Sequence, residues 1–173
     1  LAELVFRLVC EGVVEGPEFI ARRMVIFASE DVGLADNRAL EVAVAAAHAL
    51  SFVGLPEATF ALTHAALYLA TAPKSNSVTT TMAAARRAVR EGPTPAVPLH
   101  LRDAHYSGAG EIGHGEGYLY PHDYPGHIVD QQYWPDGQPP RTLYRPSKQG
   151  AEKARAEWFA ELEAMIGRKR NRE

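Results

Sequence analysis

The sequence predicts an all-α fold that contains one long irregular segment, and three observations support this prediction. Apolar residues recur at three- and four-residue spacing over residues 1–91, which is typical of helices with one buried side. Eighteen of the 26 Gly and Pro residues lie between Gly92 and Gly150, where missing donors and backbone entropy oppose a long helix. No two alternating apolar stretches predict a pair of strands.

Glycine and proline divide residues 1–91 into five expected helices. The first ends at Gly12 and Gly16, and the second opens at Pro17, because the first turn of a helix tolerates a missing N–H. The apolar sides of these two helices consist of Leu1, Leu4, Val5, Leu8 and Val9, and of Phe19, Ile20, Met24 and Phe27.

The third expected helix is rich in alanine and runs from Arg38 to Val53, with Asp36 or Asn37 as its cap and Gly54 at its end. Small side chains allow neighbouring helices to approach closely, so we place this helix at the centre of the fold. It is apolar on nearly every side, and we therefore expect it to be covered all round.

The fourth and fifth expected helices are also bounded by proline, serine and glycine. The fourth runs between Pro56 and Pro73. Its apolar residues are Phe60, Leu62, Leu67 and Leu69. The fifth is capped by Ser75, Asn76 or Ser77 and closes at Gly92.

Residues 92–146 are expected to form an irregular but ordered segment packed on the core. This part of the chain is rich in tyrosine and histidine, and its tyrosines and Trp134 are too apolar for a plain flexible linker. After Pro146, Ser147 is expected to cap a final helix. Its apolar side consists of Ala154, Trp158, Leu162, Met165 and Ile166. We thus expect one domain with a helical core (1–91), this segment (92–146), and a helix with a basic tail (147–173).

Composition and charge narrow the function classes. A hydrophobic share of 46% allows a buried core, and a net charge of −3 gives no overall attraction to nucleic acid or acidic membranes. The single cysteine, Cys10, excludes an internal disulfide and fits a reducing compartment. No apolar stretch is long enough to span a membrane. The chain starts at Leu1, within an amphipathic pattern, so we expect a fragment of a longer protein.

The sequence predicts no nucleotide site. The segment GAGEIG, Gly108 to Gly113, has three glycines in dinucleotide-binding spacing, but no buried strand is predicted before it and no helix after it. We interpret it as a glycine-rich turn. None of the four lysines follows a glycine, which excludes a phosphate-binding P-loop. We therefore expect no ATP binding and no catalytic residue in this chain.

Histidines support a rival hypothesis, a small metal-dependent enzyme that uses the histidine-rich loop. Three zinc ligands could come from His100, His105, His114, His122 and His127, with Asp123 beside His122. Their spacing matches no zinc motif, and the only cysteine is far away in the sequence. We favour polar histidines that bond loop backbone, and no metal site.

Tyrosines near basic residues suggest a surface on which single-stranded bases stack. Between Gly92 and Gly150, however, four basic and six acidic side chains leave a net charge of −2. Stacking without phosphate neutralisation is weak, so we expect weak and salt-dependent DNA binding. We interpret the basic clusters elsewhere as solvated helix faces. They are Arg22 and Arg23; Arg86, Arg87 and Arg90; and Arg168 to Arg172.

Five stretches of the chain follow one another in the order of a known family. They are FIARRMVIFASEDVGLAD (Phe19 to Asp36), ATAPKSNSV (Ala70 to Val78), VPLHLRDA, GYLYPHDYPG and QQYWPDG…LYRPSKQGAE. Together they resemble the replication-associated recombination protein A family of AAA+ ATPases, whose eukaryotic relative is the Werner-helicase-interacting protein. The resemblance extends from about Phe19 to Ala151, so it is more specific than any short motif.

The resemblance implies the carboxy-terminal part of an AAA+ ATPase that acts at stalled replication forks and in recombination. It implies a helical tetramerisation domain similar to the collar that joins clamp-loader subunits. ATP and magnesium would bind in a missing amino-terminal module, and this part needs no cofactor. The expected partners are further copies in a homotetramer and the parent ATPase module, with DNA and single-strand-binding protein left open for the full-length protein. No membrane partner is expected, and the expected location is the bacterial cytoplasm, at the nucleoid.

The residues that the resemblance marks are expected to be structural or interaction residues. They are Arg22, Arg23, Ser29, Glu30, Asp31, Gly33, Asp36, Pro73, Lys74, Ser75, Asn76, His122 and Tyr133. The acids lie near helix ends, where carboxylates accept amide hydrogen bonds, and Gly33 permits a sharp turn. The alternative is that Glu30 and Asp31 act as acid and base, but adjacent helical residues point in different directions. Lys74 is expected to meet a helix carboxyl end or an acidic partner.

The chain departs from the family pattern at two places in the irregular segment. His114 and Glu116 stand where family members commonly carry Tyr and Lys. Asp103, Ala104 and His105 replace the usual Asn-Ala-Pro. A basic loop contact has become acidic, so we do not carry over a DNA contact for this loop.

Overall fold

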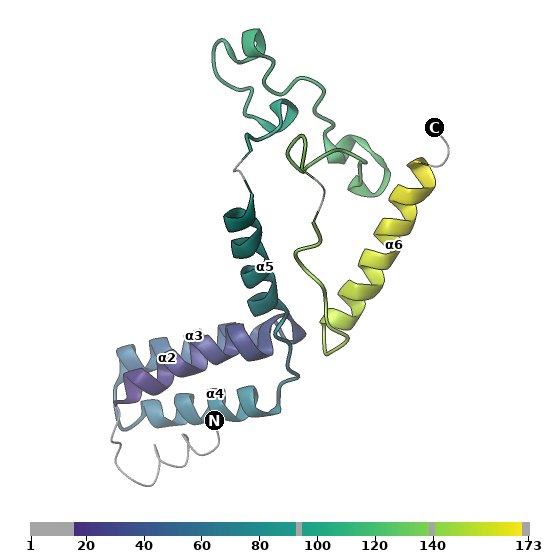
Figure 1. Cartoon of the computed structure of the whole chain (residues 1–173). Helices are drawn as coiled ribbons and strands as arrows, with labels where there is room; N and C mark the ends of the chain where they lie inside the picture. The colour runs from purple at the N-terminus through teal and green to yellow at the C-terminus, as the bar shows by residue number, and fades with distance from the viewer. Residues whose placement is uncertain (1–15, 93–94, 139–140, 171–173) are drawn as a thin grey trace. The chain divides into compact units, whose positions relative to one another are not determined.

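The computed structural model describes residues 16–92, 95–138 and 141–170. Within these residues the chain forms five α-helices and no strand, which confirms the predicted all-α class (Figure 1). The helices are α2 (Pro17–Phe27), α3 (Arg38–Val53), α4 (Ala58–Thr71), α5 (Ser77–Glu91) and α6 (Glu152–Arg170). The helix expected before Gly12 lies outside the described residues. No described helix combines the length and apolar character that crossing a membrane requires.

The chain folds as two compact units. The first contains the residues up to Ala84 together with Leu143–Trp158, and the second contains Ala85–Thr142 and the chain from Phe159 onward. The sequence instead predicts segment boundaries after residues 91 and 146. That residues 92–146 pack on the helical core, as part of one domain, stays a prediction.

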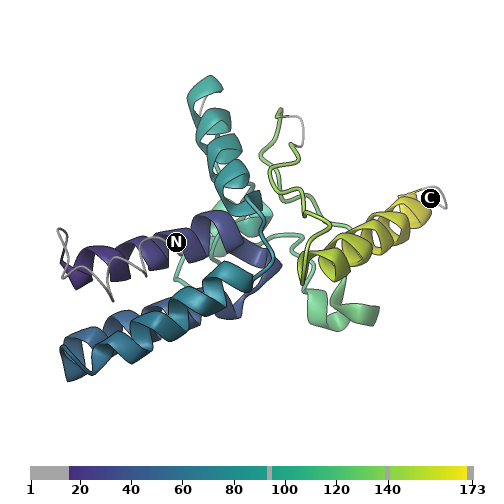
Figure 2. The ribbon, with the colours of Figure 1, turned by 90° about the horizontal axis from the view of Figure 1, so that it is seen from below.

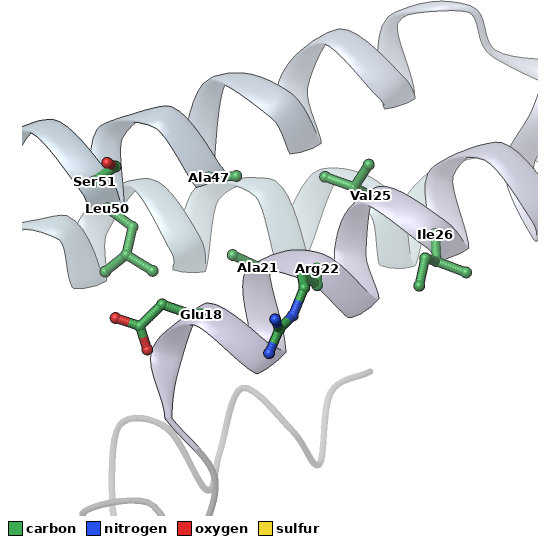
Figure 3. A pocket seen from close by; sticks show the side chains of 8 residues that line it. All are labelled: Glu18, Ala21, Arg22, Val25, Ile26, Ala47, Leu50 and Ser51. Carbon is green, nitrogen blue, oxygen red and sulfur yellow. The ribbon is translucent and has the colours of Figure 1, made fainter.

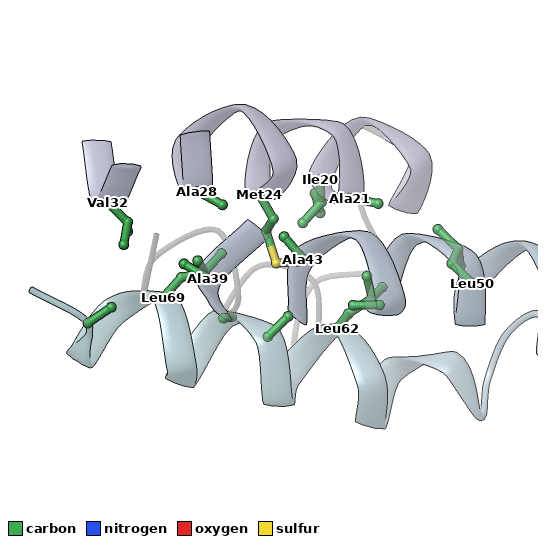
Figure 4. Packing of buried hydrophobic residues seen from close by; sticks show 14 of the residues in the cluster. Ile20, Ala21, Met24, Ala28, Val32, Ala39, Ala43, Leu50, Leu62 and Leu69 are labelled. Carbon is green, nitrogen blue, oxygen red and sulfur yellow. The ribbon is translucent and has the colours of Figure 1, made fainter. Parts of the chain in front are cut away.

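Helices α2, α3 and α4 lie side by side in the first unit, as both Figure 1 and Figure 2 show. Helix α3 packs against both of the others through a buried stripe of three alanines and one leucine, Ala39, Ala43, Ala46 and Leu50, which recur once per turn on one side. Because alanine keeps the helices close, a few larger side chains complete the core. Figure 4 shows Met24 of α2 pointing toward the other two helices, where Leu62 and Leu69 of α4 are buried.

The apolar residues of α3 and α4 are only partly covered by the part of the chain that the structure describes. On α3, Leu40, Val44 and Phe52 remain exposed, although the sequence predicts a helix covered all round. On α4, Phe60 and Leu67 are likewise exposed. The core buries one side of each helix and leaves a second apolar side in solvent.

The predicted cap of α3 is confirmed for Asp36. Its Oδ1 accepts the backbone N–H of Arg38 at 3.0 Å, and its Oδ2 accepts the phenol of Tyr68 at 2.8 Å. This second bond raises the pKa of Tyr68, with a further contribution from burial. Asp36 therefore fixes the start of α3 to the body of α4.

Three connecting segments meet at one end of the first unit. After α2 the chain makes a turn of π-helix (Ala28–Val32) and a short 3-10 turn (Gly33–Ala35). The N–H of Ser75 donates to the carbonyl of Asp31, and the N–H of Ala151 donates to the carbonyl of Ala35, both at 2.8 Å. The links between α2 and α3, between α4 and α5, and before α6 are thus bonded together.

Helix α6 begins at Glu152, five residues later than the sequence predicts. Ser147 does not cap it, because its hydroxyl accepts the N–H of Gln149 in a local turn. Gly150 then has a φ of +50°, which is incompatible with a continuing helix. The side chains of Trp158 and Met165, expected on the apolar side of this helix, are exposed.

The described part of residues 95–138 contains only short 3-10 turns, so the predicted irregular segment is confirmed. Gly108 and Gly113 have φ values of +86° and +72° on either side of one such turn, which agrees with a glycine-rich turn rather than a nucleotide loop. Side chains hold the segment in place: Arg102 donates to the carbonyl of Val97 at 2.8 Å, and Gln131 accepts the N–H of Leu119 at 2.7 Å. Polar contacts of this kind, rather than regular structure, link parts of the segment to one another.

We predict that Gly150→Ala destabilises the first unit, because a Cβ at this position would lie 2.2 Å from the carbonyl oxygen of Ala35. Together with the positive φ, this clash should lower the free energy of unfolding by at least about 2 kcal/mol, measured by urea denaturation. Gly137→Ala is the matched control, since Gly137 has a φ of +74° but nothing within 4 Å. The control should cost about 1 kcal/mol. Equal costs for both variants would contradict the close approach.

Candidate functional site

A buried carboxylate, Glu152, lies where the three connecting segments of the first unit meet. Its side chain is 0% exposed, yet it accepts five hydrogen bonds. The hydroxyls of Ser75, Ser77 and Ser147 donate to it at 2.5, 2.6 and 2.5 Å. The phenol of Tyr144 donates at 2.7 Å and the backbone N–H of Ser147 at 3.2 Å. We call these five residues the Glu152 cluster.

The hydrogen bonds decide the charge state of the cluster. Burial alone would raise the pKa of Glu152, but the donors Ser147, Ser75, Ser77 and Tyr144 outweigh burial and hold this pKa at about 2. Burial, and next the bond to Glu152, raise the pKa of Tyr144 to about 12. At neutral pH the carboxylate is therefore ionised and the phenol keeps its proton, as the bonding pattern requires.

This geometry suits anchoring better than catalysis. A carboxylate whose pKa is near 2 is a poor general base at neutral pH. Each serine hydroxyl uses its single proton in a bond to Glu152. Because Glu152 is a weak base, this bond does not activate any of the serines as a nucleophile. The carboxylate instead joins the segment before α5 to the segment before α6.

The cluster brings together some of the residues that the sequence analysis marks. Ser75 donates directly to Glu152, and Gly33 lies so close that a Cβ there would be 2.7 Å from the carbonyl oxygen of Ser75. Pro73 touches the same junction, because a Cβ on Gly150 would lie 2.7 Å from its Cγ. Asn76 is exposed, and its carbonyl accepts the N–H of Thr80 at the start of α5. The marked glycine and proline thus support the junction through close packing.

The acidic residues of the segment between α2 and α3 differ in the groups that they use for hydrogen bonds. Only Asp36 uses its carboxylate, at the start of α3. Glu30 and Asp31 have exposed side chains, and their backbone carbonyls accept the hydroxyl of Thr79 and the N–H of Ser75. The expectation that their carboxylates accept amide bonds is therefore not met here. Ser29 is half-buried in the same turn.

Lys74 meets a helix carboxyl end, which is one of its two predicted environments. Its Nζ donates to the carbonyl of Leu69 at 2.8 Å and to the carbonyl of Ala72, and it lies 5.6 Å from the ring centre of Phe27. The ammonium group thus satisfies carbonyl groups that the last turn of α4 leaves without helical partners. Arg22 and Arg23 are exposed on α2.

The structure does not assemble the candidate metal ligands. Among the described residues, no three of the His, Cys, Asp and Glu side chains are placed to hold a metal ion. His100 Nε2 lies 2.7 Å from the carbonyl oxygen of Gln132, which is the loop-backbone bond that the sequence analysis favours. His105 Nδ1 lies 2.7 Å from Oδ1 of Asp103 at the surface.

The remaining histidines of the second unit pack against other rings. The Nδ1 of His114 lies 2.6 Å from the phenol oxygen of Tyr106. The ring of His122 lies 4.7 Å from that of His127, centre to centre. Tyr133 is exposed, and neither it nor His122 belongs to the unit that contains the Glu152 cluster.

The sequence motifs do not single out Glu152, although it ends the quoted stretch LYRPSKQGAE. The sequence does contain one feature that could have pointed to Glu152. This residue is the only acid between Arg145 and Arg155, and it lies near residues with hydroxyl groups. Its partners, however, come from positions up to 77 residues away in the chain. Only folding reveals that these hydroxyls converge on one carboxylate.

A second surface of the first unit is apolar and open. The outer side of α4 forms a shallow groove, which we call the α4 outer face. It is lined by Pro56, Thr59, Phe60, Thr63, His64, Leu67, Tyr68 and Thr71. Another groove lies between α2 and α3 (Figure 3), and its lining includes the charged residues Glu18 and Arg22. These surfaces are suited to binding another apolar surface rather than a small polar substrate.

We predict that Glu152→Gln destabilises the protein by about 2 to 3 kcal/mol at pH 7, because an amide group would face hydroxyl donors. In the wild type this contribution is complete above the ordinary glutamate pKa of 4.5 and is lost as the pH falls toward about 2. Urea unfolding at several pH values should therefore show the two proteins converging below pH 4.5.

Glu157→Gln is the control for this prediction, since Glu157 is an exposed acid on the same helix. It should leave the free energy of unfolding nearly unchanged at every pH. A difference between Glu152→Gln and wild type that does not vary with pH would show that the carboxylate charge is unimportant.

Comparison with known proteins places this architecture in a family. The model of the family described as MgsA AAA+ ATPase C terminal matches residues 5–163. The chain is 51% identical over 156 residues (90% of its length) to an uncharacterized AAA domain-containing protein of Mycobacterium tuberculosis. It is 42% identical over 133 residues (77%) to the replication-associated recombination protein A of Bacillus subtilis, and 40% identical over 160 residues (90%) to that of Escherichia coli K12.

The similarity covers only part of the length of each relative. The chain spans about one third of the length of each relative: 34%, 32% and 36% in the order given. The resemblance inferred from the five sequence stretches is thereby confirmed. The chain belongs to the MgsA AAA+ ATPase C-terminal family, the family of the carboxy-terminal domain found in replication-associated recombination protein A.

Proposed function

We propose that this chain is the self-association and interaction domain of an AAA+ ATPase and carries no catalysis of its own. The α4 outer face is the observation that carries this proposal. Phe60 and Leu67 are 83% and 62% exposed on this face, on the side of α4 opposite the buried Leu62 and Leu69.

The composition of α4 supports a permanent cover for this face. Residues 58–71 contain no Asp, Glu, Lys or Arg, so α4 is uncharged all round. A helix of this kind is stable in water when both of its sides are buried. Among the residues that the structure describes, only one side of α4 is buried, and we infer that a further surface covers the other.

A second copy of the chain is better suited to cover the α4 outer face than a transient partner. Obligate interfaces between copies of a protein are more apolar than the interfaces of transient complexes, whose partners must each be soluble on their own. Closed symmetric assemblies let one type of patch satisfy every copy. That the assembly is a tetramer, similar to a clamp-loader collar, is taken from the family resemblance alone.

The role of the longer protein is proposed from its relatives. Because several of them are named replication-associated recombination protein A, we infer that the parent ATPase acts in replication-fork maintenance and recombination. ATP and magnesium would then bind an amino-terminal module, and DNA or single-strand-binding protein would engage the full-length protein. We expect it at the bacterial nucleoid.

Two substitutions test self-association. Phe60→Ser combined with Leu67→Ser removes the exposed apolar groups while leaving the buried side of α4 intact. We expect the wild type to show a mass well above 18.9 kDa in light scattering coupled to gel filtration. The variant should require at least about tenfold higher concentration to associate, a loss of about 1.4 kcal/mol.

Ile112→Ser is the control for that experiment, because Ile112 is exposed to a similar extent as Leu67 but lies in the second unit. It should associate like the wild type. A wild-type mass that stays near 18.9 kDa over a concentration series would overturn the proposal.

The absence of catalysis is tested with the nucleotide itself. We expect calorimetric titration of this chain with ATP and magnesium to give no heat of binding, since no phosphate-binding loop is found in the sequence. ATP hydrolysis should also be undetectable. A micromolar dissociation constant for ATP would contradict an interaction-only role.

A further inference from the structure

We propose that two copies of the chain associate through a symmetric antiparallel contact between their α4 outer faces. This inference rests on the proposed function, since it names the surface and the partner through which self-association occurs. The partner is a second copy that uses the same residues. The contact is centred between Thr63 and His64.

The order of residues along α4 makes this face self-complementary. Phe60 lies about one turn before the centre and Leu67 about one turn after it, on the same side of the helix. In an antiparallel pair, Phe60 therefore meets the partner's Leu67, and Leu67 meets the partner's Phe60. Such reciprocal contacts, in which one residue meets a second residue of the partner and the second meets the partner's first, define a two-fold interface.

Side-chain size also supports this register. The groove between and beside the two large residues is lined by the short side chains of Thr59, Thr63 and Thr71. A phenyl ring and a leucine from the partner can pack into the space that these threonines leave. The same face thus supplies both the projecting groups and the hollows that receive them.

The distribution of charge along the α4 outer face allows this face to pair with the same face of a second copy. An Asp, Glu, Lys or Arg near the centre would meet its own copy and repel it, and residues 58–71 contain none of these four residue types. Charges stand only beyond the two ends, with the exposed Glu57 before α4 and Lys74 after it. The Lys74 ammonium is held at the last carbonyls of α4, so an antiparallel pair brings Glu57 toward the partner's Lys74 end. Antiparallel helix dipoles favour the same direction.

The groove between α2 and α3 is a less suitable receptor for this face. Its lining includes Glu18 and Arg22 (Figure 3). The α4 outer face offers no charged group that could pair with either side chain. Burying these two charged side chains is costly even where they pair with each other, which favours the symmetric contact over a head-to-tail one.

Opposite charges at the centre test the symmetry directly. In the proposed contact Thr63 faces the partner's Thr63, so Thr63→Glu and Thr63→Lys each bring like charges together. Each variant alone should lose about tenfold or more in association constant by sedimentation velocity. An equimolar mixture should regain association, because a glutamate then faces a lysine across the two-fold axis.

Thr71→Glu and Thr71→Lys provide matched controls on the same helix face. The two copies of position 71 are separated by 15 residues of helix rise in this register, about 22 Å, so they do not face each other. Mixing these two variants should give no more association than either alone. Circular dichroism melts of all four variants check that the helical fold is retained.

The outcomes separate this inference from the proposed function. If the wild type associates but the Thr63 mixture stays as weak as its components, or the Thr71 mixture alone recovers, the symmetric contact is wrong and self-association stands. If the wild type remains at 18.9 kDa, both proposals fail. Recovery by the Thr63 mixture alone supports the two-fold contact.

Discussion

The buried carboxylate of Glu152 is the interaction on which the arrangement of the first unit depends. Burying an ionised group costs several kcal/mol unless donors surround it, and here five hydrogen bonds do so. The donors come from the segment before α5 and from the chain leading to α6. The charge is therefore stable only when both segments are in place, which ties the start of α6 to the three-helix core.

The same end of the unit also fixes α4. Asp36 accepts the phenol of Tyr68 from the last turns of this helix, and Lys74 satisfies its final carbonyls. The core side of α4 is filled by Leu62 and Leu69. A helix held at its end and along one side presents its other side at a constant orientation. This rigidity is what the proposed pairing with another copy requires.

The chemistry of the described residues is consistent with a structural role. The strongest perturbation of a carboxyl pKa lowers it, so Glu152 stays charged and bonded rather than taking up and releasing protons near neutral pH. The family to which the chain belongs is defined by the carboxy-terminal part of AAA+ ATPases. A domain that is anchored by a buried charge and exposes an uncharged helix face fits the proposed role in assembly.

The sequence by itself determined the fold class, the positions of α2 to α5, the irregular segment and the family, because periodicity, Pro and Gly act locally. It also predicted Asp36 or Asn37 as the cap of α3, and the two alternatives for Lys74. Only the tertiary structure decided that Ser75, Ser77, Tyr144 and Ser147 converge on Glu152, since these partners are distant in sequence. It also decided which side of α4 is buried, since large apolar residues lie on both sides of this uncharged helix and do not by themselves distinguish its core side from its outer face.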